Sequence, residues 1–257
     1  MRVDGSVVLI TGASAGIGAA CAGEFARAGA KLALTARSED GLRRAGGPNA
    51  LILPGDLTKE ADRRRVIDRT IETYGRIDIL LNNAGVGVYW PSWNIPMEEV
   101  RFLMELNFFA VLGLTQLALP HMRACKSGMV VNVGSIGGKM VLPWLTVYCA
   151  TKFAVGALTE GMRMELKRDG VRTLLVCPGY VVTGFQENVR AGQPPDRVKQ
   201  GRRLAITAER CARDIRRAVE RDARTVVTPW AGWFLVLAMR LFPRIVESRM
   251  AEMNETA

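Results

Sequence analysis

This chain of 257 residues has little histidine, and its cysteines are scattered. His121 is the one histidine, and the five cysteines form no CxxC pair: Cys21, Cys125, Cys149, Cys177 and Cys211. A zinc site needs clustered cysteine and histidine ligands, and a disulfide framework needs paired cysteines. We therefore expect no metal site, and we expect reduced thiols, as in a reducing cytosol.

Long hydrophobic runs are missing too. The longest, residues 230–237, is too short to span a bilayer. The N-terminus shows no extended apolar region followed by a small-residue cleavage site, so we expect no signal peptide. These features favour a cytoplasmic protein.

Acidic residues are outnumbered, with 25 Asp and Glu against 35 Lys and Arg, and the net charge is +10. Most of the excess lies in residues 163–224. Such a bias suits a nucleic acid, an anionic membrane surface, an anionic cofactor or a solvated basic surface. No aromatic residues interleave with the basic ones, and no nucleic-acid motif is present, so we expect no nucleic-acid partner.

Short apolar runs alternate regularly with longer helical patterns. Continuous apolar runs are typical of strands buried on both faces of a parallel sheet. Seven strands are predicted, at residues 7–10, 31–35, 50–54, 77–81, 128–133, 172–177 and 224–227. Helices are predicted between them, at residues 16–28, 59–74, 97–123, 146–168 and 207–222.

This alternation predicts an α/β protein, a Rossmann-like doubly wound parallel sheet of about seven strands with helices on both faces. The length favours a single catalytic domain over residues 1–257, with residues 229–257 as its C-terminal hydrophobic extension. Residues 184–203 are the most loop-like segment, because glycine and proline lie there among charges.

A glycine-rich turn follows the first predicted strand and opens the first helix. Glycines allow a tight turn and a close backbone approach to a pyrophosphate, and the helix N-terminus offers N–H groups to the phosphates. The turn predicts a dinucleotide site made by Gly12, Ser14, Ala15, Gly16, Ile17 and Gly18.

The end of the second predicted strand indicates which dinucleotide is bound. An NAD site usually has an acidic residue here to hold the ribose 2′-OH. Ala36 cannot do so, whereas the adjacent Arg37 can pair with a 2′-phosphate. We therefore predict that NADP(H) is preferred over NAD(H).

Further motifs follow in order along the chain. They are Gly55-Asp56-Leu57 after the third strand, Asn82-Asn83-Ala84-Gly85 after the fourth, Ser135 after the fifth, Tyr148-Cys149-Ala150-Thr151-Lys152 on the next helix, and Pro178-Gly179 after the sixth. Over roughly residues 5–228 this set resembles the short-chain dehydrogenase/reductase family. Two departures are Cys149, where small residues such as serine are common, and the tail beyond Pro229.

The resemblance implies further cofactor contacts. Asp56 would hold the adenine ring, and Thr183 and the backbone of Val181 would bond the nicotinamide carboxamide. The remaining contacts that it implies are Leu57, Asn83, Ala84, Gly85, Tyr148, Lys152, Pro178 and Gly179. It also implies a homodimer or homotetramer built on the helices at residues 97–123 and 146–168.

Reduction of a ketone needs a hydride on carbon and a proton on oxygen. Tyr148 and Lys152 are four residues apart, so on a helix they share one face, about 6 Å apart along the axis. A nearby ammonium group would lower the pKa of the tyrosine from its usual value of about 10. We predict Tyr148 as general acid in reduction and general base in oxidation, with Lys152 also holding the nicotinamide ribose.

Two more residues complete the predicted catalytic set. Ser135 would donate a hydrogen bond to the carbonyl oxygen and so stabilise its developing negative charge. The resemblance implies that Asn107 holds a water molecule linking Lys152 to solvent.

The substrate should meet the carboxyl ends of the strands, at residues 86–93, 137–145 and 180–203. These segments carry apolar and aromatic side chains: Val88, Tyr89, Trp90, Met140, Val141, Leu142, Trp144 and Leu145. They predict a small hydrophobic carbonyl or alcohol substrate. The alternative is that several of them face a neighbouring subunit or the core.

The C-terminal tail is apolar and carries Arg240 and Arg244. Three roles are open for it: a cap on the substrate pocket, part of a subunit interface, or a peripheral membrane contact as a basic amphipathic helix. Pro243 should break or kink any helix here.

The leading prediction is an NADP(H)-dependent oxidoreductase that transfers a hydride between nicotinamide and a carbonyl or alcohol carbon. The alternatives are an NADP-binding regulatory protein, a membrane-surface binder without turnover, and an isomerase or epimerase on the same fold. The presence of all four candidates, Asn107, Ser135, Tyr148 and Lys152, favours the oxidoreductase.

Overall fold

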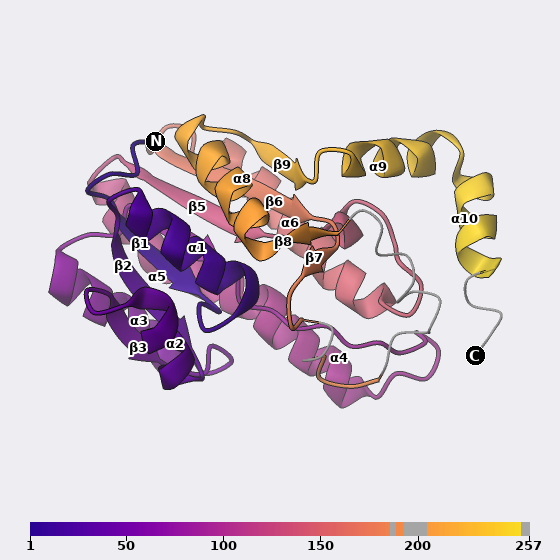
Figure 1. Ribbon diagram of the computed structural model, residues 1–257, viewed down its shortest axis with the longest axis horizontal. Helices are drawn as coiled ribbons and strands as arrows, with labels where there is room; N and C mark the ends of the chain where they lie inside the picture. Colours follow the sequence, from indigo (N-terminus) through magenta and orange to yellow (C-terminus); the bar gives the residue numbers. More distant parts are fainter. Residues whose placement is uncertain (186–188, 193–204, 253–257) are drawn as a thin grey trace.

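The computed structural model describes residues 1–185, 189–192 and 205–252. Seven parallel strands form one sheet in the order β3-β2-β1-β4-β5-β6-β9 (Figure 1). Their bounds are β1 Val7–Thr11, β2 Lys31–Ala36, β3 Leu51–Pro54, β4 Ile79–Asn82, β5 Gly128–Val133, β6 Val171–Pro178 and β9 Thr225–Thr228. The strand order reverses between β1 and β4, which confirms the predicted doubly wound, Rossmann-like fold.

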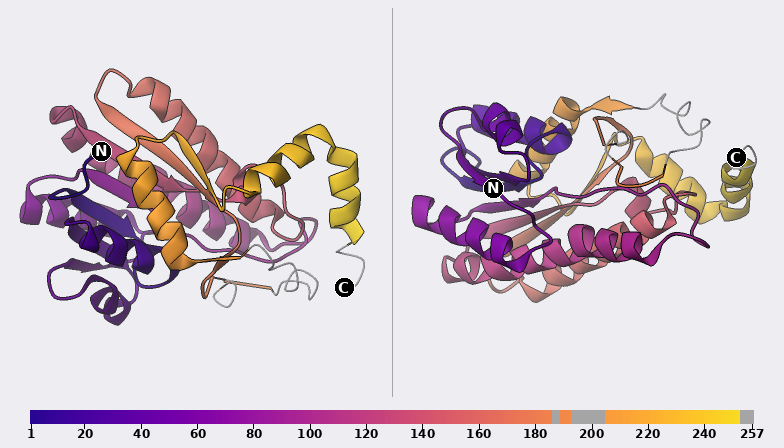
Figure 2. Two further views of the ribbon diagram at one scale, coloured as in Figure 1. Left: turned by 45° about the horizontal axis from the view of Figure 1, so that its top comes forward. Right: turned by 90° about the horizontal axis from the view of Figure 1, so that it is seen from below.

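Helices cover both faces of the sheet (Figure 2). One face carries α1 (Gly16–Arg27), α2 (Glu39–Gly46) and α8 (Ala208–Glu220). The other carries α3 (Glu60–Tyr74), α5 (Ala110–Ala124) and α6 (Thr146–Glu165). Alternate residues of β1 face opposite cores: Val8 and Ile10 pack with α1 and α8, and Leu9 packs with α3 and α5. Burial on both faces explains why the strands read as unbroken apolar runs.

The segment predicted as one helix at residues 97–123 consists of three parts. α4 (Met97–Met104) leads into a π-helical turn, η1 (Glu105–Phe109), and α5 continues from it. The stretch Met97–Ala124 is the one helical stretch among the described residues that is long and apolar enough to cross a membrane. Here α5 packs against α3 and the sheet and contributes Leu114 and Met122 to the core, so it is a core helix.

Three further elements lie near the carboxyl edge. A 3-10 turn, η2 (Ile136–Gly138), follows β5. β7 (Val181–Val182) pairs with β8 (Ile206–Thr207) in a small parallel ladder. Most of the predicted loop at residues 184–203 falls outside the described residues.

The C-terminal tail forms two helices, α9 (Gly232–Leu241) and α10 (Pro243–Glu252). The break falls at Pro243, as predicted, because proline fits the first position of a helix and not its interior. Figures 1 and 2 show α9 and α10 leading away from the sheet, toward the C-terminus.

Candidate active site

The glycine turn after β1 is packed tightly against the segment after β4. Gly12 has a φ of +64°, and a Cβ atom there would lie 2.8 Å from Ala84 Cα. A Cβ atom on Gly18 would overlap the Gly12 carbonyl oxygen and lie 2.6 Å from Asn83 Nδ2. Only glycine fits at these two positions, so the turn keeps the shape that lets a backbone approach a phosphate.

Thr11 holds this turn against the segment after β4, a role that was not predicted from the sequence. Its Oγ1 accepts hydrogen bonds from the backbone N–H groups of Asn83 and Ala84, both at 2.9 Å. Asn83 Nδ2 donates to the carbonyl oxygens of Thr11 at 3.0 Å and Gly12 at 3.2 Å. The Asn83 side chain therefore holds the glycine turn in place through two of its carbonyl oxygens.

The N-terminus of α1 suits an anionic ligand. Its N-cap, Ala15, makes no side-chain capping bond, and its first turn has no acidic residue. By contrast, α2 is capped by Ser38 and α8 by Thr207, and both have acidic residues in their first turns. Uncapped N–H groups and a positive dipole end are what phosphate groups bind, so this cradle fits the pyrophosphate of a dinucleotide.

The predicted specificity residue Arg37 lies at the carboxyl end of β2, exposed and directly before α2. A Cβ atom on Gly41 would lie 2.7 Å from Ser14 Cβ, so α2 touches the glycine turn. Glu39, the nearest acidic residue in α2, is paired with Arg43 at 3.0 Å. Arg37 therefore lies at the same edge of the sheet as the glycine turn, because β1 and β2 are paired parallel neighbours.

Asp56 follows β3 at the same edge. Its Oδ1 accepts from the backbone N–H of Thr58 at 3.1 Å and from the Thr58 hydroxyl at 2.8 Å. Asp62 Oδ2 accepts from the Asp56 backbone N–H at 2.8 Å. The Asp56 carboxylate is thus held in a defined turn beside Leu57.

Thr183 meets the glycine turn from the far end of β6. A Cβ atom on Gly16 would lie 3.3 Å from the Thr183 Cβ. Gly179 donates its backbone N–H to Thr228 O at 2.8 Å and joins β6 to β9 here. The structure therefore brings Thr183 to the predicted phosphate cradle, although the two are far apart in sequence.

The four predicted catalytic residues converge at the ends of β4 and β5. Ser135 follows β5 and hydrogen-bonds to the hydroxyl of Tyr148. Lys152 Nζ lies 5.7 Å from the centre of the Tyr148 ring and donates to Val133 O at 3.0 Å. Tyr148, Lys152 and Asn107 are all buried.

Asn107 lies in the π-helical turn η1. Its Oδ1 accepts from Val86 N at 2.9 Å, and its Nδ2 donates to Val86 O at 2.9 Å and to Thr151 Oγ1 at 3.2 Å. A Cβ atom on Gly85 would lie 3.1 Å from Asn107 Oδ1 and 3.3 Å from Lys152 Nζ. The two side chains thus meet at Gly85. π-Helical turns are frequently found at functional sites.

The pKa of Tyr148 lies above its usual value of about 10, whereas the sequence predicted a fall. Burial raises the pKa of Tyr148 strongly, and the hydrogen bond from Ser135 opposes that rise only in part. Burial also lowers the pKa of Lys152 to about 8. Loss of water disfavours the charged form of each group and is the largest cause of both shifts.

The lowered pKa of Lys152 predicts a pH effect on stability. Between about pH 8 and the ordinary lysine value of 10.5 the unfolded chain binds the proton that the folded chain has lost. Stability due to this group therefore rises with pH across that window. We expect Lys152→Met to be more stable than wild type at pH 7 by about 3 kcal/mol, and this advantage should disappear by about pH 10.5.

Urea unfolding of both proteins at several pH values measures this difference, with Lys31→Met at an exposed position as the control for loss of a lysine. A stability difference that does not change with pH would contradict the buried, partly deprotonated state of Lys152.

An apolar cluster surrounds Tyr148. Its ring lies 5.9 Å from that of Phe185, at 58°. The other members of the cluster are Tyr89, Leu142, Trp144, Leu145, Cys149 and Val189. Four of them were predicted substrate-side residues, whereas Phe185 and Val189 were not named. Their segment carries no periodic pattern that would have indicated them.

The other predicted substrate-side residues divide by burial. Val88 and Met140 are buried, Trp90 is half-buried and Val141 is exposed. Trp93, also in one of these segments, is 81% exposed. Only part of the predicted lining is therefore close to Tyr148.

Sequence reasoning also missed a buried polar network behind the site. Asn82 Nδ2 donates to Asn132 Oδ1 at 2.9 Å and to Thr115 Oγ1 at 3.2 Å. Asn132 Nδ2 donates to Thr159 Oγ1 at 2.9 Å. The network ties β4 and β5 to α5 and α6. Asn132, a single amide inside the apolar strand β5, was the one available signal.

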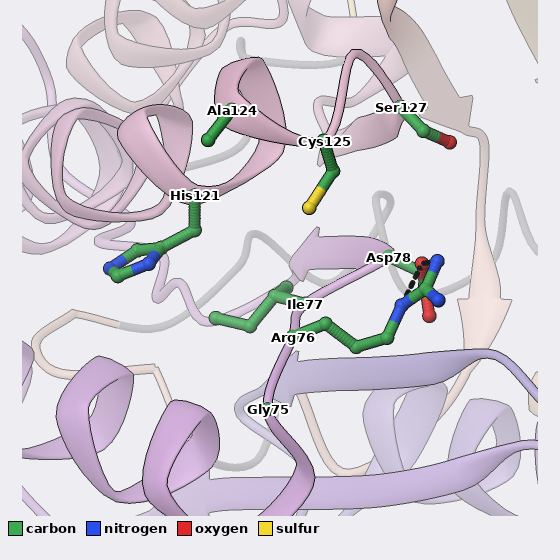
Figure 3. Close-up of a pocket in the computed structure, with 8 residues that line it drawn as sticks. All are labelled: Gly75, Arg76, Ile77, Asp78, His121, Ala124, Cys125 and Ser127. Atoms are coloured by element: carbon green, nitrogen blue, oxygen red, sulfur yellow. Dashed lines mark hydrogen bonds and ion pairs between the residues drawn. The ribbon is translucent and has the colours of Figure 1, made fainter.

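The opposite edge of the sheet carries a pocket of about 130 Å³ (Figure 3). Asp78 and Ser127 lie just before β4 and β5, and His121 and Cys125 face the pocket from the end of α5. None of the predicted catalytic residues lines it. No group of three or more potential metal ligands occurs within the ranges that the structure describes.

These features define a dinucleotide-binding protein with its polar reactive side chains at the carboxyl edge of a Rossmann-like sheet. The family model described as short chain dehydrogenase matches residues 6–194. The chain belongs to the short-chain dehydrogenase/reductase family and is an oxidoreductase acting on CH–OH groups.

Relatives and solved structures agree with this assignment. The chain is 34% identical to 11-beta-hydroxysteroid dehydrogenase-like 2 of Arabidopsis thaliana, over 96% of this chain and 80% of that protein. A short chain dehydrogenase/reductase from Burkholderia phymatum in complex with NAD matches with a TM-score of 0.86 and 28% identity, over 97% of this chain and 96% of that one. A short chain dehydrogenase from Burkholderia cenocepacia in complex with NADP gives 0.82 and 26%, over 97% and 99%.

Proposed function

We propose that this protein is an NADP(H)-preferring oxidoreductase that reduces a hydrophobic ketone or aldehyde, or oxidises the matching alcohol. One observation carries the proposal: Ser135, Tyr148, Lys152 and Asn107 meet beside the glycine turn. We further propose a single cytoplasmic catalytic domain over residues 1–257.

The residues that would hold the cofactor lie along the carboxyl edge. Gly12, Ser14, Ala15, Gly16, Ile17 and Gly18 would take the pyrophosphate, and Arg37 the 2′-phosphate. Asp56 and Leu57 would take the adenine side. Lys152, Thr183 and the backbone around Val181 would take the nicotinamide side, with the remaining contacts from Asn83, Ala84, Gly85, Tyr148, Pro178 and Gly179. When bound, the cofactor supplies or accepts the hydride.

The chain's own residues manage the proton. Burial keeps Tyr148 protonated, the state that a general acid needs, and its hydroxyl is the proposed donor to the carbonyl oxygen. Ser135 stabilises the negative charge that develops on that oxygen. With a pKa of about 8, Lys152 is charged in most molecules at neutral pH and stabilises the phenolate left behind. Asn107, next to Lys152, is the proposed holder of a water molecule that replaces the proton.

The proposed substrate is hydrophobic because the residues packed around Tyr148 are aromatic and aliphatic. The name of the Arabidopsis thaliana relative, a hydroxysteroid dehydrogenase-like protein, is consistent with this class. A homodimer or homotetramer is supported by exposed apolar side chains on the helices at residues 97–124 and 146–165, namely Met97, Phe109, Phe153 and Met164.

The test follows NADPH and NADH absorbance separately with a panel of hydrophobic ketones and aldehydes. Wild type is expected to consume NADPH well and NADH poorly. In Arg37→Ala, kcat/KM for NADPH should fall roughly ten- to hundredfold, because a charged hydrogen bond to the 2′-phosphate is lost, and kcat/KM for NADH should change little. Arg44→Ala, a second exposed arginine in this region, is the matched control.

Equal use of both cofactors by wild type would refute the NADP preference. Failure to bind either cofactor, measured by fluorescence titration, would refute the function itself. If a cofactor binds and no carbonyl compound reacts, alcohols with NADP⁺ are tested next, and inactivity there as well counts against the proposed substrate class.

A further inference from the structure

The C-terminal segment 230–245 holds the densest group of exposed apolar side chains in the described parts of the chain. It contains Trp230, Trp233, Phe234, Leu235, Leu237, Leu241, Phe242 and Ile245. Trp230 is 67% exposed and Phe234 is 63% exposed, and their rings are tilted by 59° with their centres 5.4 Å apart. Contiguous exposed apolar surface of this kind marks an interaction site.

The body of the protein leaves α9 largely uncovered. Val236 is the one buried residue among those described in α9. The helix joins the body at its start, where a Cβ atom on Gly232 would lie 3.1 Å from the Ile136 side chain. From there α9 and α10 lead away from the sheet (Figure 1). The apolar cluster around Tyr148 includes no described residue of either helix.

The charge in this segment has one sign. Between Thr228 and Val246 the only charged residues are Arg240 and Arg244, and both are exposed. The chain as a whole carries a net charge of +10. The segment thus combines aromatic and aliphatic side chains with arginine and has no carboxylate. This combination complements a bilayer, which has an apolar interior and can have anionic headgroups.

We propose that α9 and the start of α10 dock this protein on the surface of a membrane that contains anionic phospholipid. The ten residues of α9 extend about 15 Å, half the thickness of a bilayer core, so the helix lies in the surface and does not cross it. Arg240 and Arg244 reach the lipid headgroups while the apolar side chains enter the acyl region.

A second copy of the chain fits this surface less well than lipid does. Trp233, Phe234 and Leu235 are consecutive and exposed, so they point in directions about 100° apart around the helix. One protein surface covers one side of such a helix, whereas lipid surrounds a wide apolar arc.

Docking through α9 would hold the catalytic edge near the lipid. Ile136, which meets the start of α9, directly follows Ser135. A hydrophobic substrate dissolved in the membrane would then be close to the site. This consequence rests on the proposed function, whereas the docking itself does not.

Flotation of the full chain with vesicles tests the docking and needs neither cofactor nor substrate. Vesicles of phosphatidylcholine alone are compared with vesicles that also contain phosphatidylglycerol. Wild type should float with the anionic vesicles. Phe234→Ser/Leu237→Ser should lower the partition coefficient roughly a hundredfold, and Arg240→Gln/Arg244→Gln roughly tenfold, with the latter loss reproduced in wild type by added salt.

Two control variants match these changes elsewhere on the surface. Arg213→Gln/Arg217→Gln removes the same charge from exposed positions of α8, and Trp93→Ser removes an exposed aromatic side chain from the turn before α4. Both should float like wild type. All variants should keep the wild-type melting temperature, because every changed side chain is exposed.

Absence of wild-type flotation with anionic vesicles would overturn the proposal, and so would equal flotation of wild type and both tail variants. Sedimentation velocity without lipid identifies the competing occupant. If Phe234→Ser/Leu237→Ser reduces the size of the assembly and wild type does not float, the segment covers a second copy of the chain, and the membrane proposal is wrong.

Discussion

Tyr148→Phe is expected to lower kcat for carbonyl reduction roughly a hundred- to ten-thousandfold while leaving NADPH binding nearly unchanged. The substitution removes only the hydroxyl that hydrogen-bonds to Ser135. The phenylalanine ring keeps the contacts with Phe185 and the apolar cluster, so the fold should tolerate the change. Single-turnover absorbance of bound NADPH measures the rate, and fluorescence titration measures the affinity.

Tyr74→Phe is the matched control, since it removes a tyrosine hydroxyl that donates to Leu32 O at 3.1 Å on another part of the fold. It should lower stability by about 1 kcal/mol and leave kcat unchanged. A near-wild-type rate in Tyr148→Phe would remove Tyr148 from the proton path, and the assignment of Ser135 as its partner would fail with it.

The strands were predictable because burial on both faces of the sheet makes each one a continuous apolar run in the sequence. Val8, Leu9 and Ile10 are apolar in succession since they alternate between two cores. The glycine turn was predictable for a similar reason. At Gly12 and Gly18 the backbone passes too close to its neighbours for any side chain, and no other residue type could have stood there.

Other features depend on contacts between distant segments, which local pattern does not record. The π-helical turn that carries Asn107 has the same local composition as an ordinary helix. Thr11 and Asn132 act through partners about 70 and 30 residues away. Burial is the largest cause of the raised pKa of Tyr148. The four-residue spacing of Tyr148 and Lys152 does not indicate how deeply the two side chains are buried.

α2 was missed because it is short and mostly solvent-facing, with Leu42 as its one large buried side chain. α2 nevertheless belongs to the site, because its N-cap, Ser38, is next to Arg37 and its Gly41 lies against Ser14 of the glycine turn. The tail illustrates the reverse case. Its composition was plain but leaves three roles open, and the membrane role is our proposal from the exposure of the α9 side chains.

Gly18→Ala is expected to damage both the fold and the cofactor site, although it adds a single methyl group. The new Cβ atom would overlap the Gly12 carbonyl oxygen and lie 2.6 Å from Asn83 Nδ2. These are backbone and braced side-chain atoms, so the turn itself must shift. We expect a loss of about 2–3 kcal/mol in unfolding free energy and, since the N–H groups move from the phosphate position, roughly a hundredfold weaker NADPH binding.

Gly23→Ala provides a control in the same helix with the opposite sign. A Cβ atom there meets nothing closer than the end of the Arg27 side chain, at 3.9 Å. Alanine also loses less backbone entropy than glycine on forming a helix, so this variant should gain about 0.5–1 kcal/mol and bind NADPH as wild type does. Thermal unfolding and NADPH titration are measured for both variants. The comparison shows whether a loss in Gly18→Ala comes from close packing in the turn or from alanine anywhere in α1. Equal stability and affinity in the two would show that the turn has room for a side chain at Gly18, and the fit of the phosphate cradle would then lose its main support.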